Sequence, residues 1–476
     1  MKAGNRITLP PDGEEKLLGL FVRDRAFYRR FFPLLFVICL QQLAALAVNM
    51  ADNIMLGRYS ELSLSGATLV NQIQFVLQQI ASGTGMGIVA LSSQYWGRKE
   101  IRPIRRIISL GVKFGLLTGL VFFLAARLIP RQLLSLFTND EAVIAEGLRY
   151  LRVISWTYLI FGLSNSLMYS LQSVETAGVG TVMSVSTLII NVCLNSLLIY
   201  GKLGAPELGI VGAAIATLVS RTVELIIILS YVLLIDKKLK MKAADLLRFD
   251  FGYWKDFLKV SMPIVLSGAL WGVAQGAQTS VLGHIGAAVI AANSIALAIF
   301  QMFAVVGFSC TNAASVTIGK TIGERQFHKL RAYTKTLQGI LLIVGVVFGS
   351  LILICKDAII GFYTVSDETR RLASHFLTVM GITTVGTCYE FPVESGIIGG
   401  GGNTRYAAIT DNLFMWLFTI PSAVLSAFVF RWRPEVTFFL LKADQLLKCI
   451  PNSIYCNSFR WVRILTRHDS NEQIMQ

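Results

Sequence analysis

A stretch of sixty residues without one acidic or basic side chain, from Val260 to Gly319, constrains this chain more than any other feature. About 20 consecutive apolar residues form a helix long enough to cross the hydrocarbon core of a bilayer. The stretch therefore predicts two membrane-spanning helices. We expect the tight turn between them near Gly283-His284-Ile285-Gly286.

The composition extends this interpretation to the whole chain. Of the 476 residues, 54% are hydrophobic and only 15% are charged, whereas about a quarter are charged in a typical soluble domain. The net charge of +15 could suggest nucleic-acid binding. However, the basic residues lie between apolar blocks, where the positive-inside rule for membrane proteins explains them better. The residues before Phe31 are polar and basic, so we expect no secretory signal there.

Apolar blocks predict an all-α polytopic membrane protein with twelve transmembrane helices. The predicted spans are 31–57, 64–92, 107–129, 143–171, 181–202, 208–235, 260–283, 287–319, 335–355, 371–399, 407–430 and 434–458. The twelfth is the most polar, because it contains Lys442, Asp444 and Lys448. Asp444 and Lys448 are four residues apart, so they could pair on one helix face.

The distribution of Lys and Arg predicts the orientation. Basic residues are concentrated in alternate connections and in both terminal regions, at 23–30, 98–106, 237–248, 320–331 and 460–467. Loops rich in Lys and Arg stay in the cytoplasm. We therefore expect both termini to be cytoplasmic, in the plasma (inner) membrane, which agrees with an even number of spans.

The chain also repeats itself at a constant offset of 226 residues. The matching pairs are Leu56 and Leu282, Gly57 and Gly283, Gly97 and Gly323, Arg105 and Arg331, Thr138 and Thr364, Leu151 and Leu377, Val153 and Val379, and Thr157 and Thr383. Each copy contains six predicted spans. The repeat therefore predicts two six-helix lobes related by a pseudo-twofold axis along the membrane normal, with a substrate path between them.

The repeat also suggests domain boundaries. We expect a cytoplasmic N-terminal tail at 1–30, a first lobe at 31–235 and a cytoplasmic linker at 236–259. A second lobe would occupy 260–458 and a cytoplasmic C-terminal tail 459–476.

One carboxylate, Asp52, interrupts the otherwise uncharged apolar run from Phe31 to Leu56. An ionised side chain is costly in hydrocarbon, so such a residue is a functional-site hypothesis by default. The alternative is a helix-end acid that reaches the lipid headgroups. The flanking Asn49 and Asn53 favour a protein-facing position. The equivalent residue of the second copy is the neutral Gln278, so ion coupling through this position would belong to the first lobe.

Three further polar residues could join Asp52. Asn191 and Asn195 are four residues apart on one face of the fifth span, and Thr217 lies in the sixth. Together the four side chains offer oxygen ligands for a small cation, Na⁺ included, or a hydrogen-bonded cage for an acid that binds a proton. Interhelical hydrogen bonding alone is the alternative for the Asn pair. For Arg221 and Glu224 in the same region, a structural ion pair is favoured over a site.

The second lobe has polar candidates of its own. Glu390 and Glu394 are four residues apart in the tenth span, where two like charges on one face favour binding of a proton or a cationic substrate. The alternative is a structural network with Arg405 and Asp411. Further polar contacts to substrate could come from Gln275, Gln278 and Asn293.

Three motifs resemble those of the multidrug and toxic compound extrusion (MATE) transporters. They are Ala-Asp-Asn-Ile-Met-Leu-Gly at 51–57, Gln-Tyr-Trp-Gly-Arg at 94–98 and Gly-Gly-Gly-Gly-Asn-Thr-Arg at 399–405. The resemblance covers roughly residues 31 to 465. It implies a V-shaped pair of six-helix bundles, alternating access, and export of cationic organic compounds driven by inward H⁺ or Na⁺.

The resemblance also implies roles for particular residues. The first-lobe acid of the family falls on Asp52, the polar pair on Asn191 and Asn195, and a nearby hydroxyl on Thr217. The chain departs from the family pattern in two places. Asn195 stands where a second carboxylate is frequent, and the seventh span has Trp271 where many members have a Glu. We expect Glu390 or Glu394 to take over the role of that seventh-span Glu, although the resemblance itself does not imply this.

Together these observations predict a secondary active antiporter that exports cationic or amphipathic organic compounds against H⁺ or Na⁺. It would act as a monomer in the lipid bilayer, without a cofactor other than the coupling ion and without nucleic acid. A flippase for a lipid-linked precursor is the alternative, but little intramembrane Lys or Arg is present beyond Arg221 and Lys113. An intramembrane enzyme is disfavoured, because the four His residues are scattered and no DDxxD-type metal motif occurs.

Overall fold

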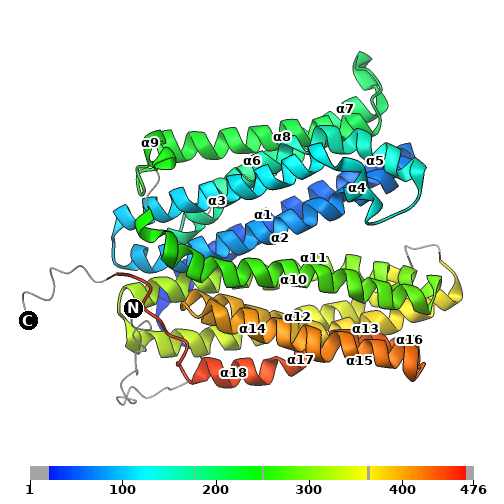
Figure 1. Cartoon of the computed structure of the whole chain (residues 1–476). Coiled ribbons are helices and arrows are strands. Elements are labelled where there is room, and N and C mark those ends of the chain that lie inside the picture. The colour runs from blue at the N-terminus through cyan, green and yellow to red at the C-terminus, as the bar shows by residue number, and fades with distance from the viewer. Residues whose placement is uncertain (1–20, 177, 249–250, 362–364, 468–476) are drawn as a thin grey trace, which may run out of the picture. The chain divides into compact units, whose positions relative to one another are not determined.

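The computed structural model describes residues 21–176, 178–248, 251–361 and 365–467. Within these ranges every regular element is a helix (Figure 1). Each of the twelve predicted spans coincides with one helix or with a consecutive series of helical segments. Nine helices in the described part of the chain are long and apolar enough to cross a membrane. The predicted all-α polytopic membrane fold is confirmed.

The first half of the chain contains the first six spans and their short connecting helices. These elements are α1 (Arg25–Tyr59), α2 (Glu61–Gly97), α3 (Ile101–Leu128), α4 (Pro130–Ser135), α5 (Glu141–Ile154), α6 (Trp156–Ser173), α7 (Gly178–Tyr200), η1 (Lys202–Gly204), α8 (Ile210–Ser230), η2 (Tyr231–Ile235), α9 (Ala243–Leu247) and η3 (Phe251–Tyr253).

The second half contains six spans with more interruptions. Its elements are α10 (Trp254–Ile285), α11 (Ala287–Gly323), α12 (Phe327–Ile360), α13 (Asp367–Phe391), η4 (Pro392–Ile398), α14 (Thr404–Phe414), η5 (Met415–Thr419), α15 (Ile420–Val424), η6 (Leu425–Val429), α16 (Pro434–Lys442), α17 (Asp444–Leu447) and α18 (Cys449–Asn457). The turn predicted at 283–286 is present between α10 and α11.

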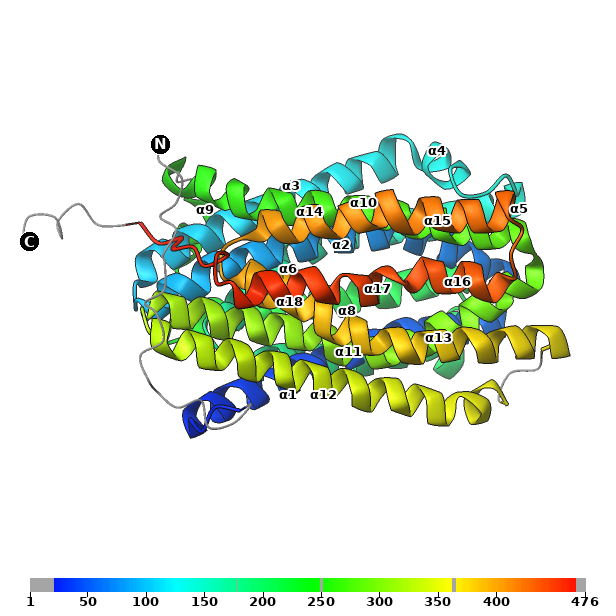
Figure 2. The ribbon, with the colours of Figure 1, turned by 90° about the horizontal axis from the view of Figure 1, so that it is seen from below.

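Two predicted spans are divided rather than continuous. The span predicted at 143–171 becomes α5 and α6, where the Tyr158 amide bonds the Ser155 carbonyl three residues before it (3.1 Å) and tightens the turn. The span predicted at 434–458 becomes α16, α17 and α18, which follow one another in a line (Figure 2). Pro451 in the first turn of α18 has no amide proton for a preceding carbonyl, which favours the break at Lys448.

The tenth span also changes its winding. After α13, the chain continues from Pro392 to Ile398 as a wider, π-helical segment. Pro392 cannot donate to the carbonyl one turn before it, and a π-helical turn accommodates that loss. Such turns are frequent at functional sites, and Glu394 lies within this one.

The helices form two compact units. The N unit consists of residues 36–92 and 100–265, and the C unit contains the described residues up to Leu35 together with 93–99 and 266–467. The last turn of α2 thus belongs to the C unit and the start of α10 to the N unit. The tails, linker and lobe limits named above stay predictions.

Each unit has its own apolar core. In the N unit, α3 packs along α6 and α7 along α8, and the core includes Leu77 and Tyr158. In the C unit, α11, α12 and α13 pack on one another. There the rings of Phe376 and Phe438 stack with centroids 3.9 Å apart, which fixes α16 on α13.

The 226-residue repeat is visible in the backbone. Lys99 and Arg325, which are equivalent in the repeat, both have positive φ angles, of 59° and 57°. Each amide bonds a carbonyl three residues earlier, that of Trp96 or Ile322, at 3.0 Å. Two unlike residues thus adopt the same strained turn at equivalent positions, as a duplication predicts. Thr364, one of the repeated residues, lies outside the described residues.

Candidate functional site

Asp52 and the three polar residues predicted around it meet in the N unit. The amide nitrogen of Asn195 donates to Asp52 Oδ1 and also to Asn191 Oδ1 (3.0 Å). Asn191 in turn donates to Thr217 Oγ1 (3.3 Å), and Thr217 donates to Asp52 Oδ2 (3.5 Å). Side chains of α1, α7 and α8 therefore close one ring of hydrogen bonds.

The helical spacing of the two asparagines makes this ring possible. Asn191 and Asn195 occupy consecutive turns of one face of α7, and both are completely buried. Asp52 lies less than two turns before the end of α1 and is only half-buried. Both amide nitrogens find acceptors within the ring, and Asp52 supplies its one acidic group.

Two features of this site were missed at the sequence level. Tyr150 of α5 is buried beside Thr217 and close to Asp52. Asn195 Oδ1 is buried without a hydrogen-bond partner in the described structure. Rotation of this amide by half a turn would direct its oxygen, in place of the nitrogen, at Asp52.

The neighbouring ion pair has a structural role. Arg221 pairs with Glu224 at 2.7 Å within α8, as the spacing predicts. Glu224 also accepts a hydrogen bond from Ser164 of α6 (3.0 Å), and the Arg221 guanidinium lies over the Phe161 ring. These contacts hold α8 against α6, and among the described residues no charged nitrogen contacts Asp52 directly.

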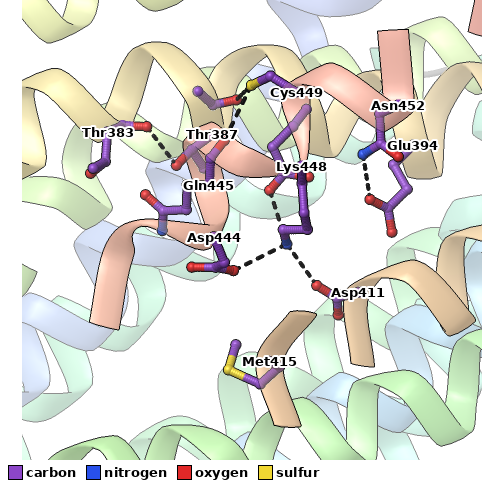
Figure 3. Close-up of polar contacts among 12 residues, drawn as sticks. Thr383, Thr387, Glu394, Asp411, Met415, Asp444, Gln445, Lys448, Cys449 and Asn452 are labelled. Carbon is purple, nitrogen blue, oxygen red and sulfur yellow. Dashed lines mark hydrogen bonds and ion pairs between the residues drawn. The ribbon is translucent and has the colours of Figure 1, made fainter. Parts of the chain in front are cut away.

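The C unit contains a second, strongly charged cluster (Figure 3). Its centre is Lys448, whose ammonium lies 2.9 Å from Asp411, 3.3 Å from Asp444 and 3.3 Å from Glu390. The predicted pairing of Asp444 with Lys448 is confirmed. Lys448 is 3% exposed, so an internal cation compensates acids from three different helical segments.

Glu394 lies at the edge of this cluster and has a different partner. Its Oε2 accepts a hydrogen bond from Asn452 of α18 at 2.6 Å (Figure 3). Tyr406 donates to Asn452 (3.1 Å) and stacks on Tyr455, so the amide is held in place. Glu390 contacts Lys448 through its Oε1. Its second carboxylate oxygen, Oε2, is buried without a hydrogen-bond partner in the described structure.

The remaining second-lobe candidates meet elsewhere in the C unit. Gln275, Gln278 and Asn293 line a small pocket together with Lys442, which donates to Gln278 Oε1 at 3.1 Å. The structure thus separates the predicted second-lobe site into two places, an acidic cluster around Lys448 and an amide-lined pocket beside Lys442.

The glycine-rich motif at 399–405 forms the connection into α14. Gly402 has a φ of +100°, a conformation that side-chain-bearing residues rarely adopt. Gly401 lies against the ring of the fully buried Trp461, where a Cβ would collide. The motif therefore serves close packing of the C-terminal segment. No group of three or more metal-ligating side chains occurs among the described residues.

Comparison with known proteins identifies the family. The MatE family model matches residues 33–197 and 263–425, one segment in each half of the chain. A probable multidrug resistance protein NorM from Xylella fastidiosa is 23% identical over 390 residues, which is 80% of this chain and 81% of that protein. A protein of the same name from Bacillus anthracis is 24% identical over 417 residues, covering 86% and 90%.

Solved structures have the same fold. An outward-facing multidrug resistance MATE family transporter of the MOP superfamily matches 92% of this chain and 99% of its own, with a TM-score of 0.81 and 17% identity. The Vibrio cholerae MATE transporter VcmN matches 91% and 96%, with a TM-score of 0.83 and 16% identity. With the matched family model, the twelve helical spans and the duplicated halves, this chain belongs to the MatE family, the multidrug and toxic compound extrusion transporters.

Proposed function

We propose that this chain is a secondary active antiporter that exports organic compounds in exchange for H⁺ or Na⁺ bound at Asp52. The observation that supports it is the surroundings of the Asp52 carboxylate, which contacts two uncharged groups, Asn195 and Thr217. An ionised carboxylate in such surroundings is costly, and a bound proton or cation relieves that cost.

The residues around Asp52 fit either coupling ion, but not equally well. Na⁺ prefers several oxygen ligands, which Asp52, Asn191, Asn195 and Thr217 could supply, including the unpartnered Asn195 oxygen. A proton needs only the carboxylate. Because the ring contains a single acid, H⁺ is the better fit, and no protein cofactor is required.

Binding of the ion would act on the helices through the hydrogen-bond ring. Neutralising Asp52 weakens the charge-assisted bonds from Asn195 and Thr217, and these bonds link α1 to α7 and α8. A ligand shifts a conformational equilibrium only through different affinities for the two states. Asp52 must therefore bind the ion more tightly in one access state than in the other.

The exported compounds are, in this proposal, cationic or amphipathic organic molecules. The acids around Lys448 favour a cationic group in the C unit. The candidates are Glu394, whose hydrogen-bond partner is the neutral Asn452, and Glu390, whose Oε2 has no hydrogen-bond partner in the described structure. The multidrug-resistance names of the relatives are consistent with this class of substrate. According to the loop charges, we place both termini in the cytoplasm. We further propose that the transporter is a monomer in the plasma membrane.

Transport by the purified protein in vesicles tests the proposal. A fluorescent organic cation is loaded, and a pH gradient or a Na⁺ gradient is imposed separately. Export driven by either gradient supports antiport, and the effective gradient identifies the ion. Gradient-independent movement of the dye, or movement of a lipid-linked precursor instead, would refute the proposal. Asp367→Asn, which changes an exposed acid at the start of α13, is the matched control.

A further inference from the structure

Arg127, in the last turn of α3, has two aromatic neighbours but no hydrogen-bond acceptor. Its guanidinium lies 5.4 Å from the ring centroid of Phe123 and 5.2 Å from that of Trp156. The two rings are themselves in contact, with centroids 4.7 Å apart. Among the described residues the Arg127 side chain makes no hydrogen bond or ion pair. The rings hold the guanidinium in place, but they provide no counter-ion and no acceptor for its five N–H donors.

A second arginine with the same property shares a helix face with Trp156. Arg152 is four residues before Trp156, and Ser155 between them keeps helical φ and ψ angles of −55° and −30°. The side chain of Arg152 is exposed and makes no hydrogen bond or ion pair with the described residues. By contrast, Arg131 in the next helix after α3 pairs with Glu141 at 2.7 Å. The fold therefore gives Arg127 and Arg152 no anion of its own.

One face of α3 leads to Arg127 as an exposed apolar stripe. Leu117, Val121, Leu124 and Leu128 recur every three or four residues and are between 44% and 75% exposed. The helix is long and apolar enough to cross a membrane, and Arg127 lies one residue before its end. Arginine and tryptophan at the end of a spanning helix lie at the level of the lipid headgroups. The stripe is thus a surface for acyl chains, with a cation at its headgroup end.

The unpaired donors indicate the chemistry of the headgroup. A planar guanidinium matches two oxygens of a phosphate, and these charge-assisted bonds are stronger than neutral ones. The indole N–H of Trp156 also has no acceptor among the described residues, and the side chain is 48% exposed. Two arginines favour a lipid with a net negative charge over a zwitterionic lipid, whose own ammonium cancels the phosphate charge.

We propose that Arg127, Arg152 and Trp156 bind the phosphate of an anionic phospholipid, with an acyl chain along the stripe of α3. The site lies within the N unit and does not depend on the proposed export function. Phe123 acts as a positioning residue, because its ring supports the guanidinium of Arg127. The bound lipid connects the end of α3 to the break between α5 and α6.

Native mass spectrometry of the purified protein in a neutral detergent tests the site. Phosphatidylglycerol and phosphatidylcholine with identical acyl chains are titrated separately, and the apparent Kd of the first bound lipid is measured. Arg127→Gln should weaken binding of phosphatidylglycerol about tenfold or more and leave phosphatidylcholine within about twofold, because hydrogen bonds between charged groups are lost. Arg152→Gln should weaken phosphatidylglycerol about fivefold, as expected for one basic residue at a membrane surface.

The matched control is Arg58→Gln, which should change neither lipid. Arg58 is also exposed in the last turn of a spanning helix, and it has no ion pair and no ring contact among the described residues. Trp156→Leu retains both arginines and should still weaken phosphatidylglycerol, which keeps the test decisive if Arg127→Gln folds poorly.

Three results would overturn the inference. The first is equal affinity of the wild type for the two lipids. The second is an equal loss of phosphatidylglycerol binding in Arg58→Gln and Arg127→Gln, which would mean attraction to surface charge in general. The third is displacement of the lipid by an equal concentration of glycerophosphoglycerol, the same headgroup without acyl chains, since the site would then bind a free phosphate ester and the stripe would have no part in it.

Discussion

Gly97 of α2 and Gly323 of α11 occupy equivalent positions in the repeat, and each lies against the other's helix. A Cβ on Gly97 would collide with the Lys320 carbonyl, and one on Gly323 would collide with that of Gln94. Lys320 and Gln94 are themselves 226 residues apart. The contact, which lies within the C unit, is therefore reciprocal between equivalent positions of the repeat.

This crossing predicts a strong effect of a single methyl group. Gly97→Ala and Gly323→Ala should each destabilise the protein by about 1–3 kcal/mol, because the backbone of the facing helix must move. Thermal unfolding of purified protein in detergent measures the effect. The control is Gly276→Ala, at a helical glycine with nothing within 4 Å of the added carbon. Equal midpoints for Gly97→Ala and Gly276→Ala would contradict the crossing.

A second carboxylate beside Asp52 should change the coupling ion. In Asn195→Asp, two acids would share the place where Asn195 now donates to Asp52. Two neighbouring like charges favour a bound cation between them. We expect Na⁺ to raise the unfolding temperature of Asn195→Asp more than that of the wild type, because ligand binding stabilises the folded state. Choline chloride at the same concentration is the control, and equal shifts in the two proteins would refute the expectation.

Removal of Lys448 should be among the most damaging single changes. Lys448→Met leaves Glu390, Asp411 and Asp444 without their shared cation, and breaking a buried ion pair costs about 3–5 kcal/mol. Adding Glu390→Gln removes one uncompensated charge and should restore part of that loss. Unfolding midpoints and yields of folded protein measure both steps. A double variant no more stable than Lys448→Met would show that Glu390 and Lys448 are not coupled.

The start of α1 should have a pH-dependent contact. Tyr333 donates to Asp24 (2.6 Å), and this hydrogen bond holds the pKa of Asp24 below its usual 3.8, helped by Lys329 at 3.7 Å. A lowered pKa means that the contact stabilises the protein above about pH 3.8 and is lost as the pH falls through the lower, folded-state value. Asp24 is partly exposed, with 27% of its side chain accessible, so the effect is at most about 1 kcal/mol.

Asp24→Ala measures that contribution. Its unfolding midpoint should lie below the wild-type midpoint at neutral pH, and the difference should shrink in acid, where wild-type Asp24 is also uncharged. A difference independent of pH would mean that the contact does not depend on the carboxylate charge.

The sequence predicted the N-unit site well because most of that site follows from the spacing of residues within single helices. Asn191 and Asn195 share a face by helical spacing alone, and an acid in an apolar run must find polar partners. The twelve spans followed from hydropathy in the same way. Thr217 was a candidate from its place in the sixth span, but spacing could not show that it meets Asp52, since the register of α8 against α1 depends on tertiary packing.

The C-unit sites were harder to predict for the same reason. That Glu390, Asp411 and Lys448 meet depends on the rotation and register of three helical segments, which spacing within one segment does not determine. The interruptions at Ala443 and Lys448 turn the two lysines of the twelfth span toward different neighbours. The polar residues of this span identified it as unusual in the sequence. That Lys442 and Lys448 have different partners became visible only from the packing of the helices.

Ion-driven export by Asp52→Asn protein tests the central claim most directly. Vesicles with the wild type, Asp52→Asn or the Asp367→Asn control are given the same gradient, and dye export is recorded at equal amounts of inserted protein. Asparagine retains the size of the side chain but cannot bind a proton, so we predict that export is abolished while insertion is normal. Gradient-driven export at the wild-type rate by Asp52→Asn would contradict ion coupling at this carboxylate.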